Sequence, residues 1–330
     1  MKNFFIKSLN GMALGLFSSL ITGLILKQIG SLFSINFLIQ LGTLSQFLMG
    51  PAIGAGIAFA LSSHPLIITA SLITGAFGAG SINFVDSLAT IRIGEPIGAY
   101  LSTVFAVFLV NKIAGKTKFD IILLPILTIT IGCLIGKFLS PFISELIKNL
   151  GLIINKSTEL NPILMGLTVS VIMGLLLTLP TSSAAIGISL GLSGLAAGAA
   201  LTGCCCQMIG FAIISYDDND IGTTLSIAFG TSMIQIPNII KNPLIWLPAT
   251  LSSAILGVLS TTIFKLETNS IASGMGTSGL VGQLSTFSLI GTSYILPMLI
   301  LHFLLPSIIS YFIYKFMKKR NYIKKGDLKL

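Results

Sequence analysis

Long apolar stretches follow one another along this chain from Met12 to Tyr314, and few charged residues interrupt them. A helix needs about 20 apolar residues to cross the hydrocarbon core of a bilayer. Only 9% of the 330 residues are charged, whereas soluble domains carry about a quarter. Because only helices and closed barrels satisfy their backbone polar groups in lipid, the sequence predicts an all-α polytopic membrane protein with about ten transmembrane helices.

The candidate spans are separated by short polar or basic segments. We place them at residues 9–28, 35–61, 65–80, 96–111, 120–139, 161–179, 191–214, 221–239, 243–264 and 291–314. Lysines precede the first span and follow the last, so both termini are expected in the cytoplasm, and the acidic loop, residues 217–220, is expected outside. Residues 141–160 are interpreted as a helix that lies on the membrane surface.

Most of the excess positive charge lies at the end of the chain. The basic residues of this segment are Lys315, Lys318, Lys319, Arg320, Lys324, Lys325 and Lys329. We therefore expect one transmembrane domain, 1–314, and a basic cytoplasmic tail, 315–330. The tail accounts for much of the net charge of +9 without a nucleic-acid partner. Contact with anionic membrane lipid is a second interpretation of the same lysines.

Three stretches rich in small or polar residues interrupt the pattern of spans, at 81–95, 180–189 and 271–288. Non-helical backbone survives at membrane depth only where protein or a water-filled cavity satisfies it, so these stretches predict two or three re-entrant hairpins at a translocation site. Ordinary loops outside the membrane are the alternative. The tetrapeptides LITG (72–75) and ALTG (200–203) further indicate an internal repeat, a common device in transporters.

The stretch NFVDSLATIRIGEP (83–96) contains three charged residues, Asp86, Arg92 and Glu95. An ionisable group at membrane depth costs several kcal/mol unless it is paired or hydrated, so it is a functional candidate. Arg92 and Glu95 would share a face if the turn were helical, and Arg92 would then neutralise Glu95 while leaving carboxylate oxygens for a ligand. The alternative is that both residues anchor a loop in the outer interface.

IGEPIGAYL (93–101) resembles the Gly-Ile-Thr-Glu-Pro element of the EIIC membrane subunits of the sugar phosphotransferase system, in which the Glu binds sugar hydroxyls. From MKNFFIKSLNGMALG through GTSGLVGQ, the chain resembles the EIIC-like proteins described as toxin-regulator-type membrane proteins of Gram-positive bacteria. The resemblance implies a homodimer in the bacterial cell membrane, with Glu95 as a ligand for a hydroxyl-rich solute. The Thr of the element is missing here, and the Glu-Pro pair falls early in the chain rather than late.

Other polar residues within or between the apolar segments complete a candidate solute-binding set. The full set is Asn83, Asp86, Arg92, Glu95, Thr181, Ser182, Gln207, Gly276, Thr277 and Ser278. For Gln207, as for Gln235 and Asn238, the alternative role is hydrogen bonding between helices. His302 is interpreted as a packing residue, with a proton relay as the alternative. We expect no metal site, no cofactor and no intrinsic enzymatic activity.

These patterns together predict a permease that moves a small, polar, hydroxylated, sugar-like solute by alternating access. Separate cytoplasmic proteins of the phosphotransferase system would have to supply any phosphorylation. One alternative is a secondary transporter coupled to protons or sodium, with Asp86 or Glu95 as the coupling group. The other is a membrane regulator that senses a solute and signals through its basic tail.

Overall fold

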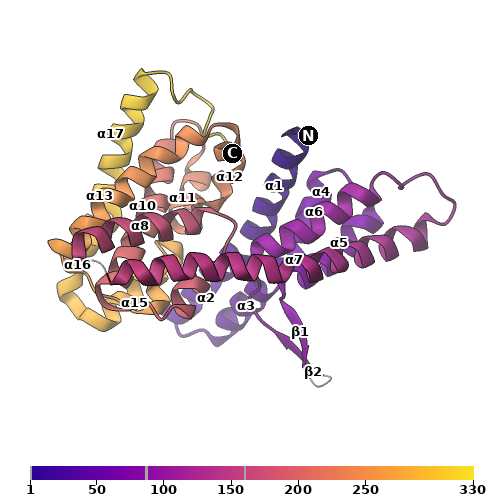
Figure 1. The fold of residues 1–330 in the computed structure, drawn as a ribbon, viewed down its shortest axis with the longest axis horizontal. Helices are drawn as coiled ribbons and strands as arrows, with labels where there is room; N and C mark the ends of the chain where they lie inside the picture. The colour runs from indigo at the N-terminus through magenta and orange to yellow at the C-terminus, as the bar shows by residue number, and fades with distance from the viewer. Residues whose placement is uncertain (1, 86–87, 160) are drawn as a thin grey trace. The chain divides into compact units, whose positions relative to one another are not determined.

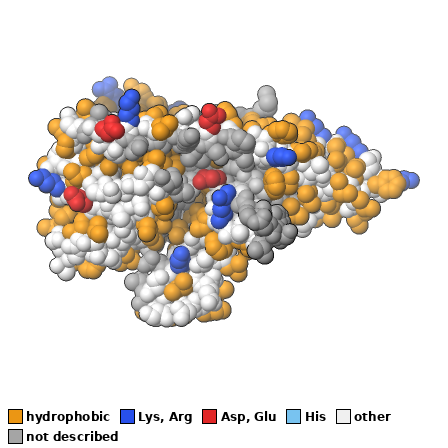
Figure 2. Space-filling model, turned by 60° about the horizontal axis from the view of Figure 1, so that its bottom comes forward, with side chains coloured by type: hydrophobic (Ala, Val, Ile, Leu, Met, Phe, Trp, Pro, Cys, Tyr) orange, Lys and Arg blue, Asp and Glu red, His pale blue; other side chains and the backbone are white. Residues whose placement is uncertain are grey.

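The computed structural model describes residues 2–85, 88–159 and 161–330. The chain forms two compact units, Met1–Leu146 and Ile147–Leu330. Apart from one two-stranded hairpin, the regular structure of the described residues is helical, which confirms the all-α polytopic fold. Hydrophobic side chains are spread over the surface in Figure 2, and charged ones are few, as expected for a protein with lipid as its solvent.

The first unit contains the only strand pair among the described residues. In chain order it consists of α1 (Lys2–Leu16), the π-helical turn η1 (Phe17–Ile21), α2 (Thr22–Leu32), α3 (Asn36–Phe47), α4 (Met49–Ala60), α5 (Pro65–Ala79), β1 (Ile82–Val85), β2 (Leu88–Ile91), α6 (Pro96–Val110) and the first part of α7 (Asp120–Thr158) (Figure 1).

Small residues let the helices of this unit pack backbone against backbone. A Cβ atom added to Gly54 of α4 would lie 2.0 Å from the carbonyl oxygen of Ser71 in α5, and one added to Gly56 would lie 2.3 Å from that of Gly11 in α1. Such close contact between helices is typical of membrane interiors, where packing rather than water drives association. The glycines therefore hold α1, α4 and α5 together.

The predicted spans of the first unit correspond to helices, with two differences. Asn3–Ser31 is one apolar helical stretch, whereas the predicted span 35–61 is a pair of helices, α3 and α4, bent by 55°. The predicted span 120–139 and the predicted surface helix 141–160 are largely one helix, α7, of 39 residues. The helical part of the prediction for 141–160 agrees with α7, and its place on the membrane surface stays a prediction.

The second unit begins within α7 and is built around α10. It consists of α8 (Pro162–Thr178), α9 (Ser183–Ser189), α10 (Gly194–Ser215), α11 (Ile221–Phe229), η2 (Ser232–Gln235), α12 (Ile236–Lys241), η3 (Pro243–Trp246), α13 (Leu247–Thr262), α14 (Ser270–Ser273), η4 (Ser278–Leu280), α15 (Val281–Ile290), η5 (Gly291–Tyr294), α16 (Ile295–Leu299), the π-helical turn η6 (Ile300–Leu304) and α17 (Leu305–Lys319).

Helix α10 forms the core of this unit, with 94% of its most apolar window buried. Helices α8, α13 and α17 pack around it (Figure 1). Ser170 of α8 contacts Gly203 of α10, and Thr178 hydrogen-bonds Gln207, so α8 and α10 run in the same direction. The segment 179–193 must therefore carry the chain back, which confirms the predicted turn of the backbone at 180–189.

The predicted hairpin at 271–288 is also confirmed as a segment that turns back on itself. The hydroxyls of Thr268 and Thr286 lie 2.7 Å apart, and the amide of Asn269 donates to Ser285 Oγ at 3.0 Å. These contacts join the two ends of the segment. Its tip therefore lies between α14 and α15.

The predicted span 221–239 is wrong, because this stretch also turns back. Helix α11 ends after nine residues at Phe229, and Gly230 reverses the chain with φ −100° and ψ −82°. A nine-residue helix is about 14 Å long, which is half of a bilayer core. Asn219 before the turn and Asn238 after it both bind the C-terminal segment, at Leu328 and Lys329. The segment therefore enters and leaves on the same side.

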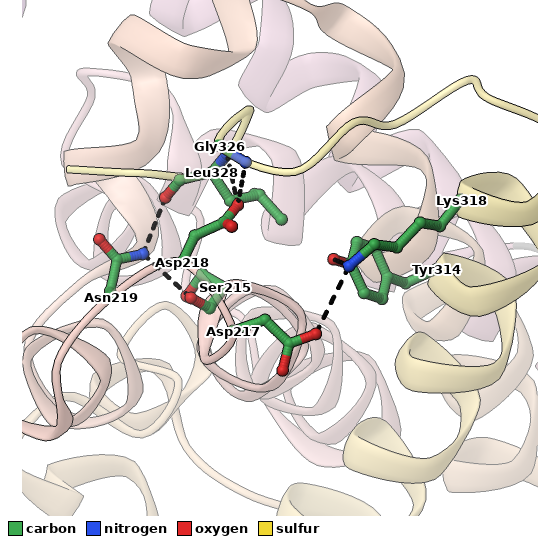
Figure 3. Close-up of polar contacts among 8 residues, drawn as sticks. All are labelled: Ser215, Asp217, Asp218, Asn219, Tyr314, Lys318, Gly326 and Leu328. Atoms are coloured by element: carbon green, nitrogen blue, oxygen red, sulfur yellow. Dashed lines mark hydrogen bonds and ion pairs between the residues drawn. The ribbon is translucent and has the colours of Figure 1, made fainter.

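The acidic loop and the basic tail lie together, which corrects the expected topology (Figure 3). Lys318 Nζ lies 3.5 Å from Asp217 Oδ2, and the backbone amide of Gly326 donates to Asp218 Oδ2 at 2.9 Å. Groups in direct contact at the ends of two helices lie on the same side of the membrane. The prediction of the acidic loop outside and the tail inside was therefore wrong.

Cysteine labelling tests this corrected topology. In a background without the four native cysteines, cysteines at Asp217 and Lys325 should react with an impermeant reagent from the same side. A cysteine at Glu267 should react from the opposite side, because α13 separates it from the acidic loop. Reaction of Asp217 and Lys325 from opposite sides would contradict the arrangement of the second unit.

Candidate functional site

Gln207 lies on α10 eight residues, or about 12 Å, before the end of the helix, and other uncharged polar side chains surround it. Gln207 Oε1 accepts hydrogen bonds from Thr178 Oγ1 at 3.2 Å and from Trp246 Nε1 at 3.0 Å, and Gln207 Nε2 donates to Thr250 Oγ1 at 3.2 Å. Ser232 Oγ lies 2.7 Å from Thr178 Oγ1. We call these five residues the polar cluster.

The polar cluster is assembled from α10 (Gln207), the end of α8 (Thr178), the start of η2 (Ser232), the end of η3 (Trp246) and α13 (Thr250). Gln207, Thr178 and Ser232 are fully buried. Unpaired polar groups in such a place would cost about 1–3 kcal/mol each, so the mutual hydrogen bonds are needed for stability. Because the partners are hydroxyls and amides rather than charges, the cluster presents groups of the kind that bind neutral hydroxyl-bearing molecules.

The tip of the returning segment 271–288 contacts the end of α11, close to the turn that carries Ser232. Thr277 Oγ1 donates to the carbonyl oxygen of Ala228, and Ser278 Oγ donates to that of Gly230 at 2.6 Å. These are carbonyls at the end of α11, which lack partners within the helix. Both hydroxyls also lie 3.6 Å from Met208 Sδ, next to Gln207.

Gly276 permits this close approach. Its backbone has φ +55°, a region that residues with a Cβ atom adopt at a cost. A Cβ atom there would lie 2.8 Å from Met208 Sδ and 3.1 Å from the carbonyl oxygen of Cys204. The tip therefore contacts α10 through a position that only glycine fills without strain.

Thr181 and Ser182 lie in the turn between α8 and α9. Thr181 is buried and its hydroxyl donates to the carbonyl oxygen of Leu176 at 2.8 Å. Ser182 is half-buried, and its carbonyl oxygen accepts the amide of Ile186 at the start of α9. The neighbouring Ser183 donates to the carbonyl oxygen of Gly274 at 2.7 Å, which joins this turn to the segment that carries Thr277.

The structure thus gathers the predicted residues of the second unit into one region around α10. The residues Thr181, Ser182, Gln207, Gly276, Thr277 and Ser278 all lie on α10 or on the returning segments beside it. The sequence did not single out Thr178, Ser232, Trp246 or Thr250. Trp246 could have been found from the sequence, because it is the single tryptophan of the chain.

The charged stretch of the first unit forms a β-hairpin that leads from α5 to α6 (Figure 1). Strand β1 pairs antiparallel with β2, which sets Asn83 opposite Thr90. The hairpin is closed at its base by backbone hydrogen bonds from Arg92 to Ser81 and from Glu95 to Ala79, both at 2.9 Å. Asp86, which the sequence predicts as a solute-binding residue, lies outside the described residues.

Glu95 is half-buried and immediately precedes α6, with Pro96 in the first turn of the helix. Its extended backbone (φ −95°, ψ 122°) excludes the helical turn that would set Arg92 and Glu95 on one face, so that expectation was wrong. Arg92 is exposed and its Nε donates to the carbonyl oxygen of Gly80 at 3.0 Å.

The two histidines of the chain, His302 and His64, also have hydrogen-bond partners. His302 Nδ1 lies 3.2 Å from the hydroxyl of Tyr294 and 3.3 Å from Gln283 Nε2, in the π-helical turn η6. His64 precedes α5, and its Nδ1 accepts the amide of Leu66 at 3.3 Å. These contacts agree with packing and capping roles for the two histidines.

Comparison with known proteins gives one match. The family model described as "Phosphotransferase system, EIIC" matches residues 6–330. No curated protein and no solved structure matches the chain. Because the family model covers almost the whole sequence, the chain belongs to the EIIC family of the phosphotransferase system, whose members are sugar-transporting membrane subunits.

Proposed function

We propose that this permease moves a small, neutral, hydroxyl-bearing solute of the sugar class across the bacterial cell membrane by alternating access. The observation that carries the proposal is the meeting of three returning segments at one buried, uncharged, polar region of α10. Transporters place broken helices at their binding sites, because irregular backbone at membrane depth is tolerated where it lines a cavity. The EIIC membership supports the same solute class.

The contacts within the polar cluster suit a site that opens and closes. Ser232 and Thr178 bind one another through hydroxyls 2.7 Å apart. A solute hydroxyl that replaces one of them restores a hydrogen bond of the same kind, so the net change in free energy is small. The returning segments are thus able to separate from α8 when solute enters, as alternating access requires.

Glu95 supplies the charged acceptor in this proposal. A carboxylate that accepts hydrogen bonds from hydroxyls contributes about 1.5–3 kcal/mol for each bond, more than a neutral acceptor. Asn83, Asp86 and Arg92 are proposed to line the same part of the pathway.

The proposal includes further components in the cell. Separate cytoplasmic proteins of the phosphotransferase system would supply a phosphoryl group to the transported solute. A homodimer follows from the family resemblance, and the exposed lysines at the C-terminal end are suited to anionic lipid.

Uptake into proteoliposomes tests the proposed function. We expect the purified protein to take up at least one member of a panel of labelled sugars, and to accumulate its phosphorylated form when phosphotransferase proteins and phosphoenolpyruvate are present. Uptake that depends only on a sodium or proton gradient would instead favour an ion-coupled carrier. Solute binding without flux in any condition would favour a membrane sensor.

Replacing Glu95 by glutamine should weaken solute binding while the protein still inserts. The change keeps the size of the side chain but removes a charge-assisted acceptor, so affinity should fall about ten- to a hundredfold. Equilibrium binding of the labelled solute measures the effect. Glu159→Gln is the matched control, because Glu159 is exposed in the turn after α7. Equal affinity in the two variants would remove Glu95 from the site.

A further inference from the structure

The last residues of the chain fold back onto the second unit. After α17 ends, the chain turns at Asn321 with φ +60° and runs to Leu330 along the acidic loop and α12 (Figure 3). Two apolar side chains of this stretch, Ile323 and Leu328, are 1% and 0% exposed. The segment is therefore packed into the unit along its length.

Side chains of the unit bind the backbone of this segment. Asn219 Nδ2 and Gln235 Nε2 donate to the carbonyl oxygen of Leu328 at 2.8 Å and 3.1 Å. Asn238 Nδ2 donates to the carbonyl oxygen of Lys329 at 2.9 Å. Three amides thus hold two consecutive peptide groups.

Further contacts extend the same arrangement in both directions. Asn242 Nδ2 donates to the carbonyl oxygen of Tyr322 at 3.1 Å. Asp218 Oδ2 accepts the amides of Gly326 at 2.9 Å and of Leu328 at 3.4 Å. We call the set Asp218, Asn219, Gln235, Asn238 and Asn242 the amide groove.

The chemistry of the amide groove identifies its ligand as a peptide that turns at residues 325–328. The groove contacts main-chain carbonyl and N–H groups and the carboxylate of Asp327, whereas Lys324, Lys325 and Lys329 are exposed. The buried side chains of Ile323 and Leu328 fix the register. Gln235 and Asn238 are 0% and 3% exposed with the peptide in place, so these amides need the hydrogen bonds that the peptide supplies.

The amide groove also joins the two ends of the returning segment 220–242. Asp218 and Asn219 precede α11, whereas Gln235, Asn238 and Asn242 follow the turn at Gly230. The bound peptide therefore connects both legs of the segment whose tip carries Ser232. Its departure would leave this segment free to change its position at the polar cluster.

We propose that the amide groove is a peptide-binding site, and that residues 322–330 of the same chain occupy it as a removable strap that fixes the segment 220–242. The recognition is through the main chain and through the side chains of Ile323, Asp327 and Leu328, so the site takes an added peptide of the same sequence in place of the strap. This inference concerns binding and flexibility, and it does not rest on the proposed transport function.

Replacing Leu328 by asparagine in the full chain should release the strap. We expect amide hydrogen exchange in 232–242 to accelerate about tenfold or more, because local opening no longer breaks the strap contacts. Lys329→Asn is the matched control, since it places the same side chain on the neighbouring exposed position. Equal exchange in the two variants would overturn the proposal.

A labelled peptide of residues 321–330, measured by fluorescence anisotropy, gives an independent readout. It should bind Leu328→Asn at least about ten times more tightly than the unmodified chain, whose groove is already filled, and it should restore slow exchange in 232–242. If Leu328→Asn does not insert, a protease site placed after Arg320 allows the strap to be cut in the folded, reconstituted protein. Rapid exchange after cutting, reversed by the peptide, is expected; unchanged exchange would refute the strap.

Discussion

Replacing Gly203 by alanine is expected to prevent the second unit from folding normally. A Cβ atom at this position of α10 would lie 2.0 Å from the carbonyl oxygen of Ser170 and 2.5 Å from its carbonyl carbon. Both atoms belong to the backbone of α8, so the contact is relieved only if the two helices separate. Overpacking of this kind costs about 3 kcal/mol or more.

Thermal stability in detergent, followed by size-exclusion chromatography, measures this effect. Gly222→Ala is the control, because the added Cβ atom there would lie 3.3 Å from Asp220 Oδ1, an atom of an exposed side chain. We expect Gly222→Ala to behave as the unmodified protein. Similar stability of both variants would mean that α8 and α10 are not in backbone contact.

Replacing Gly276 by valine should abolish solute uptake while the protein still inserts. The positive φ at this residue costs a residue with a side chain about 1–2 kcal/mol, and more for a branched one. The Cβ atom alone would lie 2.8 Å from Met208 Sδ and 3.1 Å from the carbonyl oxygen of Cys204, so the larger side chain would press on both residues. The tip that carries Thr277 and Ser278 would then leave the end of α11.

The variant Gly191→Val separates the effect of backbone strain from the effect of the contact with α10. Gly191 has φ +61°, close to the +55° of Gly276, but no atom lies within 4 Å of a Cβ atom added to it. Its variant bears the backbone strain without the contact with α10, so we expect it to retain most of its uptake. Normal uptake in Gly276→Val would show that the 274–280 segment is an ordinary loop.

Apolar periodicity and small-residue content predicted much of the helical structure. The turns at 180–189 and 271–288 were predictable, because runs of Ser, Thr and Gly do not continue a lipid-facing helix. The direction of the chain after α11 was not, since 221–239 is as apolar as a true span and its reversal depends on Gly230 and on distant hydroxyls at Thr277 and Ser278.

The candidate site was predictable only in part. Gln207 stands out in an apolar helix, because an amide in that environment needs partners. Its partners Thr178 and Ser232 come from segments far apart in the sequence, and serine and threonine are too common in membrane helices to mark a site alone. The prediction that the acidic loop and the basic tail lie on opposite sides was wrong, because acidic residues carry little topological information.

The contacts of the C-terminal segment fix the order in which the protein is completed during synthesis. Asn219 and Leu328 are 109 residues apart, and Gln235 and Leu328 are 93 apart. When α11 and α12 leave the ribosome, the residues that bind their ends have not yet been made. The segment 220–242 must therefore remain without these contacts until residues 322–330 have been made, so it is completed later than the helices around it.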